Sequence, residues 1–98
     1  MKPRDIQTNY YIKLYTGDLN DFQKSWFDRP EIISGLFKHH VFGYVVQVDD
    51  TVYKNILNGS KVITLLVRPD GDSHQIYFTF KVESVYCEEL KEMFHIER

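Results

Sequence analysis

The side chains that most often bind metal ions or attack substrates are few in this chain and widely spaced. The candidates for a zinc site are His39, His40, His74 and Cys87. Neighbouring side chains on a strand point to opposite faces, so His39 and His40 are not expected to share a metal ion. No two of the four candidates have the i, i+4 spacing of a helical metal site. The sequence therefore predicts no metal site and no bound cofactor.

Two further candidates for chemistry are better explained by their neighbours. Asp70 and Asp72 flank a glycine, as at the start of a calcium-binding loop, but the later acidic positions of such a loop are missing. A turn is the better interpretation, since Asp and Gly tolerate turn conformations. Cys87 is followed by Glu88 and Glu89, whose negative charges disfavour the thiolate that a nucleophilic cysteine needs.

The stretch from Asp49 to Val85 has the clearest local pattern, and it must position any functional residues. Its acidic start is suited to cap a helix over Thr51 to Asn58, which Gly59 can end by taking a left-handed conformation. Two β-rich runs follow, Lys61 to Arg68 and His74 to Val85, separated by the turn sequence PDGDS. We expect a capped helix followed by a β-hairpin.

The first half of the chain predicts two strands and two helical segments. Residues 1–7 have no periodicity and are expected to be frayed. Thr8 to Thr16 alternates as a strand does, with tyrosines on both faces, and Val41 to Val48 is an apolar run typical of a central strand. Between them we expect a short helix with sheet-facing apolar residues, and then a helical segment or structured loop that begins at Pro30. The apolar residues of the first helix are Leu19, Phe22, Trp26 and Phe27.

The last twelve residues, CEELKEMFHIER, follow an amphipathic helical pattern. We expect Leu90, Met93 and Phe94 on the inner side of this helix, with acidic residues outside. Together the elements predict one α+β domain over residues 1–98. It should hold a mainly antiparallel sheet of about four strands and two to four short helices.

Composition limits the classes of function. Hydrophobic residues make up 43% of the 98 residues and aromatic residues 15%, which favours a folded chain. The net charge is −2, and no cluster of Lys and Arg suited to a phosphate backbone is present. No apolar run approaches the roughly 20 residues that span a bilayer, and the start lacks the apolar segment of a signal peptide. With a single cysteine, the sequence favours a cytoplasmic protein without membrane contact.

One local resemblance to a known family lies in the helix and hairpin. ILNGSKVITLLVR, from Ile56 to Arg68, resembles the entry motif of the ASCH domain, a small PUA-like β-barrel family in which a helix ends in a Gly-x-Lys turn before a strand. Lys61 matches the family's lysine, and Thr64 matches the threonine of members that hydrolyse N4-acetylcytidine. GDSHQIYFTFKVESV, which ends at Val85, is similar to the strands that follow in the family.

The resemblance implies an amidohydrolase as one alternative. Lys61 would activate Thr64 as nucleophile and Glu83 would carry the proton, an arrangement suited to amide cleavage. The family's arginine comes five residues after the lysine, where this chain has Leu66, and Arg68 lies two residues further on.

Three hypotheses of function follow, of which the first is preferred. It is a non-enzymatic binding protein that contacts a macromolecular partner, of the kind that phages and mobile elements encode as inhibitors or regulators. The partner is expected to be a protein, with nucleic acid or a nucleoside as the alternative. The second is an ASCH-like binder of RNA or nucleobases, or an amidohydrolase. The third is a homo-oligomer that binds a small nucleotide-like ligand on its tyrosines. The expected partner-binding residues are Tyr11, Tyr15, Tyr77, Glu88, Glu89 and Glu92.

Overall fold

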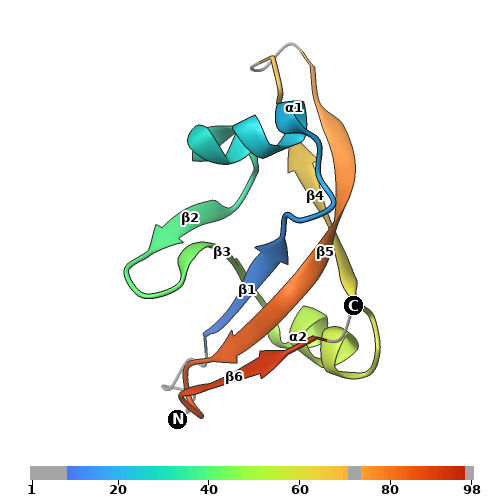
Figure 1. Ribbon diagram of the computed structural model, residues 1–98. Coiled ribbons are helices and arrows are strands. Elements are labelled where there is room, and N and C mark those ends of the chain that lie inside the picture. The colour runs from blue at the N-terminus through green and yellow to red at the C-terminus, as the bar shows by residue number, and fades with distance from the viewer. Residues whose placement is uncertain (1–8, 71–73, 97–98) are drawn as a thin grey trace, which may run out of the picture.

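The computed structural model describes residues 9–70 and 74–96, which form a mainly antiparallel sheet with short helices around it (Figure 1). The residues expected to be frayed, 1–7, and the last three residues of the PDGDS turn, 71–73, lie outside the described residues. Within the described part there are six strands, two α-helices and two short 3-10 helices. The α+β architecture agrees with the sequence prediction, but the expectation of about four strands is wrong.

Two antiparallel pairings hold the middle of the sheet together. β1 (Tyr10–Tyr15) pairs with β3 (Gly43–Val48) along one edge and with β5 (Ile76–Cys87) along the other. β2 (Leu36–His39) extends the sheet beyond β3. The central position predicted for the Val41 to Val48 run is confirmed, since β3 has a neighbour on each side, but Val41 and Phe42 belong to the turn before the strand.

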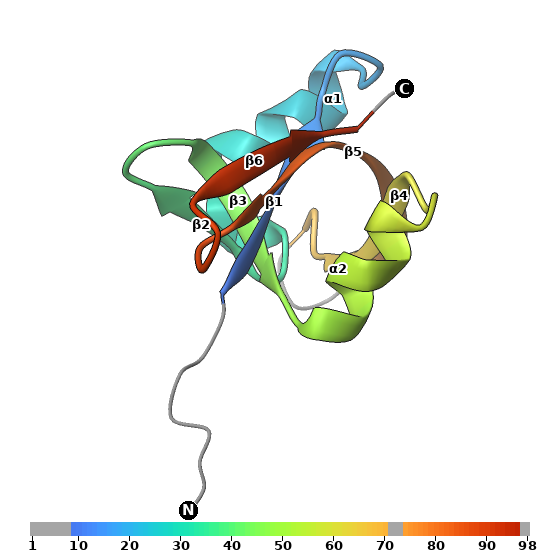
Figure 2. The same ribbon diagram turned by 90° about the horizontal axis from the view of Figure 1, so that it is seen from below.

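β5 is long enough to pair with two further strands. Its first half pairs with β4 (Val62–Val67) as the predicted hairpin, and its last four residues pair with β6 (Glu92–His95). The outer edge of β4 meets the chain before β2, because Ser34 N–H donates to the Leu66 carbonyl at 2.9 Å. A second bond runs from Arg68 N–H to the Ile32 carbonyl at 2.8 Å. The sheet is therefore strongly curled, and Figure 2 shows its strands and α2 around a shared interior.

A β-bulge lies in β5 where β1 pairs with it. Lys13 is opposite Ser84 and Leu14 is opposite Val82, so Glu83 is an extra residue on β5. The inward-facing positions therefore change from even to odd numbers along this strand. Val82 and Val85 are both fully buried for this reason, although strict alternation would place them on opposite faces.

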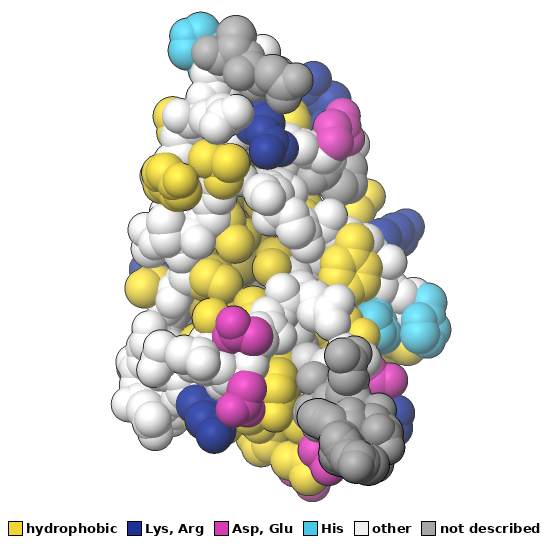
Figure 3. Space-filling model, turned by 180° about the vertical axis from the view of Figure 1, so that it is seen from behind, with side chains coloured by type: hydrophobic (Ala, Val, Ile, Leu, Met, Phe, Trp, Pro, Cys, Tyr) yellow, Lys and Arg dark blue, Asp and Glu magenta, His cyan; other side chains and the backbone are white. Residues whose placement is uncertain are grey.

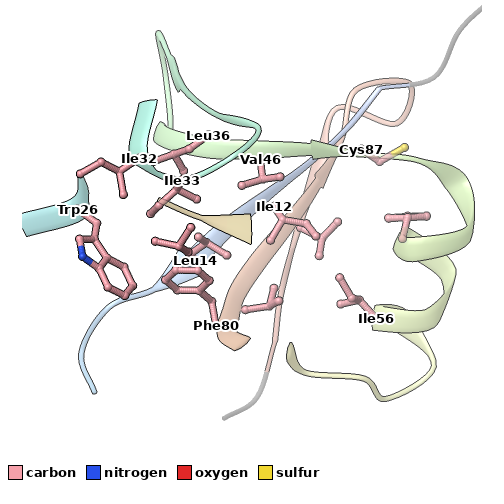
Figure 4. Packing of buried hydrophobic residues seen from close by; sticks show 14 residues of the cluster. Ile12, Leu14, Trp26, Ile32, Ile33, Leu36, Val46, Ile56, Phe80 and Cys87 are labelled. Atoms are coloured by element: carbon pink, nitrogen blue, oxygen red, sulfur yellow. The ribbon is translucent and has the colours of Figure 1, made fainter. Parts of the chain in front are cut away.

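The inner side of the curled sheet holds the hydrophobic core. Trp26 packs edge-on against Phe78 and Phe80, with ring centroids 5.3 and 6.4 Å apart. In Figure 4 the core side chains point toward one another from the strands, from the chain near Trp26 and from α2. The buried residues of this cluster are Ile12, Leu14, Trp26, Ile32, Ile33, Leu36, Val46, Tyr53, Ile56, Val67, Phe80, Val82, Val85 and Cys87.

Both α-helices have a side-chain cap at the N-terminus. Asn20 caps α1 (Asp21–Lys24), where its side chain and that of Gln23 each accept from the other's backbone N–H. Asp49 caps α2 (Asp50–Leu57) by accepting from Val52 N–H at 3.0 Å. The helix predicted over Thr51 to Asn58 is thus confirmed within one residue at each end.

The first helix is shorter than the apolar pattern predicts. After α1 the chain continues as a 3-10 helix (Ser25–Asp28), which has three residues per turn. The side chains in this part therefore do not follow the 3.6-residue spacing on which the prediction was based. Trp26 is buried as expected, whereas Phe22 is 63% exposed, with its ring packed edge-to-face with that of Trp26. The prediction that Phe22 faces the sheet is wrong.

The segment that begins at Pro30 is helical for only one short 3-10 turn (Pro30–Ile32). Ile33 then bridges to Val67, and Gly35 takes a φ of 85° that redirects the chain into β2. The pairing of Leu36 with Val46 buries the same apolar side chain that a helix would have buried. One of the two missed strands therefore lies where a helix or loop was predicted.

The second missed strand lies where the C-terminal helix was predicted. β5 continues to Cys87, and a turn in which Lys91 has a φ of 56° leads directly into β6. The turn is closed by Lys91 N–H donating to the Cys87 carbonyl at 2.8 Å. A helix this short is marginal by itself, and pairing Phe94 with Val85 buries apolar surface against the core. No acidic helix face exists there.

The core predicts unequal effects for two phenylalanines. Phe80→Ala should lower the free energy of unfolding by about 3–5 kcal/mol, because Phe80 is fully buried and its removal leaves a cavity. Phe22→Ala is the matched control and should cost only about 0.5 kcal/mol, as for other exposed positions. Urea denaturation of both variants measures the difference, and equal losses would contradict this core.

The contact of α2 with β1 predicts a change of stability at alkaline pH. Tyr10 stacks on Tyr53 with ring centroids 3.9 Å apart, and its hydroxyl donates to Asp50 at 3.1 Å. Burial, followed by the hydrogen bond and charge of Asp50, raises the pKa of Tyr10 to about 12 from 10.0.

Because the pKa is raised in the folded state, the neutral phenol stabilises the protein fully below pH 10. This contribution is lost as the pH rises through about 12. Tyr10→Phe keeps the stack but has no phenol. The stability advantage of wild type over this variant should therefore fall across that interval, as measured by urea denaturation at each pH. A constant difference would contradict the interpretation.

Candidate functional site

An aromatic surface lies on the side of the sheet that faces away from the core. Residues directly opposite one another in adjacent strands point to the same side. Tyr11 is opposite Gln47 on β3 and Tyr86 on β5, and these three therefore form a row across the sheet. The rings of Tyr11 and Tyr86 are 6.3 Å apart and nearly parallel. Because Ile12 points into the core, Tyr11 directly before it in the strand must point outward, and Tyr86 opposite Tyr11 points outward with it.

The turn between β2 and β3 brings a histidine and a phenylalanine to the same surface. His39 Nδ1 accepts from the backbone N–H groups of Val41 and Phe42 at 3.0 and 3.3 Å. Its proton in the neutral form must therefore be on Nε2. The turn also needs Gly43, whose φ of 81° lies in the region that favours glycine.

The rings of this turn are in contact with one another and with the sheet. Phe42 is 4.9 Å from His39 and 4.8 Å from Tyr86, measured between ring centroids. His40 stacks on His39 at 4.6 Å, because it lies in the turn rather than in the strand. The expectation that the two histidines point to opposite sides is wrong. Figure 3 shows histidine side chains at the right, where this turn projects from the molecule.

A chain of hydrogen bonds orients a carboxylate beside these rings. Glu88 Oε1 accepts from Asn9 Nδ2 at 2.9 Å and from the Tyr11 hydroxyl at 3.4 Å. Asn9 Oδ1 in turn accepts from Gln47 Nε2 at 2.8 Å. The backbone is also tied, since Glu88 N–H donates to the Asn9 carbonyl at 2.9 Å. The carboxylate is therefore held by two side chains at the start of the β1 segment, and one of them, Asn9, is held in turn by Gln47 of β3.

These groups line an open pocket of about 430 Å³, which we call the aromatic pocket. Its lining combines five aromatic or imidazole rings with one acidic side chain and one lysine. The two turns that carry part of the lining lie side by side at the left of Figure 2. The lining residues are Tyr11, His39, His40, Val41, Phe42, Tyr86, Glu88 and Lys91.

The pocket carries two opposite charges, from Glu88 and Lys91. The hydrogen bond from Asn9 is the largest influence and lowers the pKa of Glu88, with further contributions from the charge of Lys91 and the bond from Tyr11. The pKa of Tyr11 is raised, first by burial and then by the nearby charge of Glu88. At neutral pH the pocket therefore holds a carboxylate beside a neutral phenol.

The chemistry of this lining is suited to holding a ligand or a side chain. It contains no Ser, Thr or Cys that could act as a nucleophile. Aromatic rings and a carboxylate held in place are instead the groups that fix a ligand or a side chain by stacking and hydrogen bonding. Among the described residues, no three His, Cys, Asp or Glu side chains gather closely enough to hold a metal ion.

Two of the six predicted partner-binding residues meet in the pocket, namely Tyr11 and Glu88. Tyr15 lies at the other end of β1, with its ring so close to Gly17 that a Cβ there would clash. Tyr77 is 78% exposed and lies about 30 Å from Tyr86 along β5, at the usual rise of a strand. The structure therefore does not form one patch from the predicted tyrosines.

The two remaining acidic residues do not form a helical face with Glu88. Glu89 is exposed in the β5–β6 turn, next to the pocket in sequence but outside its lining. Glu92 begins β6 opposite Cys87, a residue of the core. Of the three predicted acidic residues, only Glu88 and Glu89 lie together, in the β5–β6 turn.

The three residues implied by the ASCH resemblance lie away from the pocket. Thr64 is exposed on the outer face of the hairpin, where its hydroxyl is 2.8 Å from that of Thr79. Lys61 is exposed just before β4, and its carbonyl accepts from Val82 N–H. Glu83 is the half-buried extra residue of the bulge in β5. No hydrogen bond or ion pair joins the side chains of Lys61, Thr64 and Glu83 within the described structure.

Several pocket residues were not predicted from the sequence. Phe42 and Tyr86 belong to apolar runs in which nothing distinguishes an outward residue from a buried one. His39 and His40 were considered only as metal ligands. The one available signal was the Gly43 that follows the histidines, since a turn at that point would place their rings together.

The hydrogen bonds to Glu88 predict a measurable change of its pKa. Asn9→Ala removes the largest influence, so the pKa of Glu88 should rise toward its ordinary value of 4.5. Because the folded pKa is lowered, the charged form stabilises the fold above pH 4.5, and this contribution is lost as the pH falls through the folded pKa. Carboxyl NMR titration measures the shift. Asn55→Ala, at an exposed position of α2, is the control, and an unchanged Glu88 in Asn9→Ala would contradict the network.

No protein-family model matches the chain, and no significant match to a curated protein or a solved structure was found. None of the helices in the described residues is long and apolar enough to cross a membrane. The resemblance to the ASCH family over Ile56 to Val85 therefore stays a prediction. The case for a function depends on the geometry of the pocket.

Proposed function

We propose that this protein is a non-enzymatic binding protein that contacts a protein partner through the aromatic pocket. The observation that carries this proposal is the convergence of rings from β1, β5 and the β2–β3 turn around a carboxylate that hydrogen bonds hold in place. Tyrosine and other aromatic residues dominate binding energy in many interfaces, because they supply large contact area with little loss of conformational freedom.

The rigidity of the pocket supports this proposal. Tyr11 is a residue of β1, and Tyr86 is a residue of β5, both of which are paired on two sides. Phe42 is fixed by the bonds from the turn to His39. A partner that meets rings already in position loses less entropy on binding than one that must order them. Such a protein would act by occupying or altering its partner, as inhibitors and regulators do.

A second candidate is a binder of a small nucleotide-like ligand. The pocket volume of about 430 Å³ lies within the usual range for small ligands, and its rings could stack on a base. The electrostatics favour this less, since a phosphate beside Glu88 would be repelled and Lys91 is the one permanent cation in the lining. The ASCH-like amidohydrolase is less favoured still, because Lys61, Thr64 and Glu83 do not meet in the pocket.

The proposal predicts that partner capture depends on one end of β5 and not on the other. Tagged wild type should capture the same host protein as Tyr77→Ala, and Tyr86→Ala should lose it, because Tyr86 lines the pocket while Tyr77 lies on the remote hairpin. The two variants change the same residue type in the same strand. Mass spectrometry of the captured proteins measures the outcome, and circular dichroism checks that both variants fold.

Two results would contradict the proposal. The first is capture that survives Tyr86→Ala and is lost in Tyr77→Ala. The second is strong thermal stabilisation by a nucleoside or nucleotide when no protein is captured at all. Loss of a hydrolytic activity in Lys61→Ala or Thr64→Ala would favour the ASCH-like alternative.

A further inference from the structure

We propose that the aromatic pocket receives an arginine side chain of the partner, with its guanidinium against the rings and hydrogen bonded to Glu88. This inference rests on the proposed function and names the chemistry that the pocket recognises. It is carried by the joint placement of an oriented carboxylate and several aromatic faces around one open volume.

The carboxylate has one oxygen in use and one that remains available. Oε1 of Glu88 accepts from Asn9 and Tyr11, whereas the charged neighbour of Oε2 is Lys91 Nζ at 4.0 Å. The side chain of Lys91 is 70% exposed, and that of Glu88 is 42% exposed. An ammonium at this distance and exposure is displaced easily. A donor from a partner can therefore reach Oε2 without breaking the bonds that orient the carboxylate.

The rings supply the second half of a cation site. The faces of aromatic rings carry negative potential and attract cations, most often the guanidinium of arginine. Phe42 and Tyr86 are 4.8 Å apart at an angle of 47°, and Tyr11 stands nearly parallel to Tyr86. A planar guanidinium can stack on one of these rings while its N–H groups point to a carboxylate, which a compact ammonium cannot do as well. This favours arginine over lysine.

The charge of Lys91 affects the binding of cationic and anionic ligands in opposite directions. It lines the pocket, and its ammonium competes with an arriving guanidinium for Glu88. Removing it should strengthen binding of a cation and weaken binding of a phosphate. Glu88→Gln should have the opposite effect on a cation, because the amide keeps the shape of the side chain but loses its charge.

The test is an NMR titration of the full isotope-labelled chain with Nα-acetyl-arginine amide. Amide signals of Phe42, Tyr86 and Glu88 should shift in the millimolar range. Nα-acetyl-citrulline amide has the same shape without the charge and should bind about tenfold more weakly, as expected for the loss of a charge-assisted hydrogen bond. Glu88→Gln should weaken arginine binding by about the same factor. Lys91→Gln should strengthen it severalfold.

Three outcomes would overturn the inference. These are equal binding of the arginine and citrulline probes, no shift at the pocket with arginine, and shifts with adenosine monophosphate that weaken in Lys91→Gln. The failure is distinguishable from failure of the proposed function. If a captured protein is lost in Tyr86→Ala but retained in Glu88→Gln, the pocket binds a partner without an arginine.

Discussion

The pairing of β1 with the bulged half of β5 is the constraint on which the rest of the fold depends. β5 pairs with β4, β1 and β6 along its length, and β1 connects it to β3 and β2. Glu83 is the extra residue that reverses the inward alternation, so that both Val82 and Val85 reach the core. Without the bulge, one half of β5 would turn its apolar side chains to solvent.

The same pairing determines the aromatic pocket, because the two faces of a strand cannot be set independently. Burial of Ile12 on the inner face places Tyr11 on the outer face, and burial of Val85 does the same for Tyr86. The pocket therefore needs no special backbone geometry in β1, and in β5 it depends on the bulge at Glu83. Both turns that line the pocket contain a residue with a positive φ, which is Gly43 in the β2–β3 turn and Lys91 in the β5–β6 turn.

Local patterns were sufficient to predict the elements whose signals lie within a few residues. The Asp49 cap, the Gly59 stop and the hairpin after Lys61 are of this kind, and each appears in the structure. β2 and β6 were missed because their strand character depends on distant partners. Phe94 is apolar at a helical spacing, yet its pairing with Val85 decides its conformation.

The pocket was even less predictable than the strands. Its residues come from positions 11, 39–42, 86, 88 and 91, and they meet only when three separate strand pairings are in register. Tyr11 and Glu88 could be proposed by residue type alone. Asn9 could not, because its role depends on the carboxylate that it orients across the sheet.

The free edge of the sheet has a consequence for how this protein behaves in a concentrated solution. Among the described residues β2 pairs only with β3, so its other edge offers unpaired backbone groups to any strand that approaches. The edge is only four residues long and contains Lys38, whose charge opposes the stacking of identical copies. Shortness and charge at this edge are the means by which natural sheets avoid growing into fibrils. The aromatic surface therefore lies beside an open strand whose shortness and charge disfavour edge-to-edge growth.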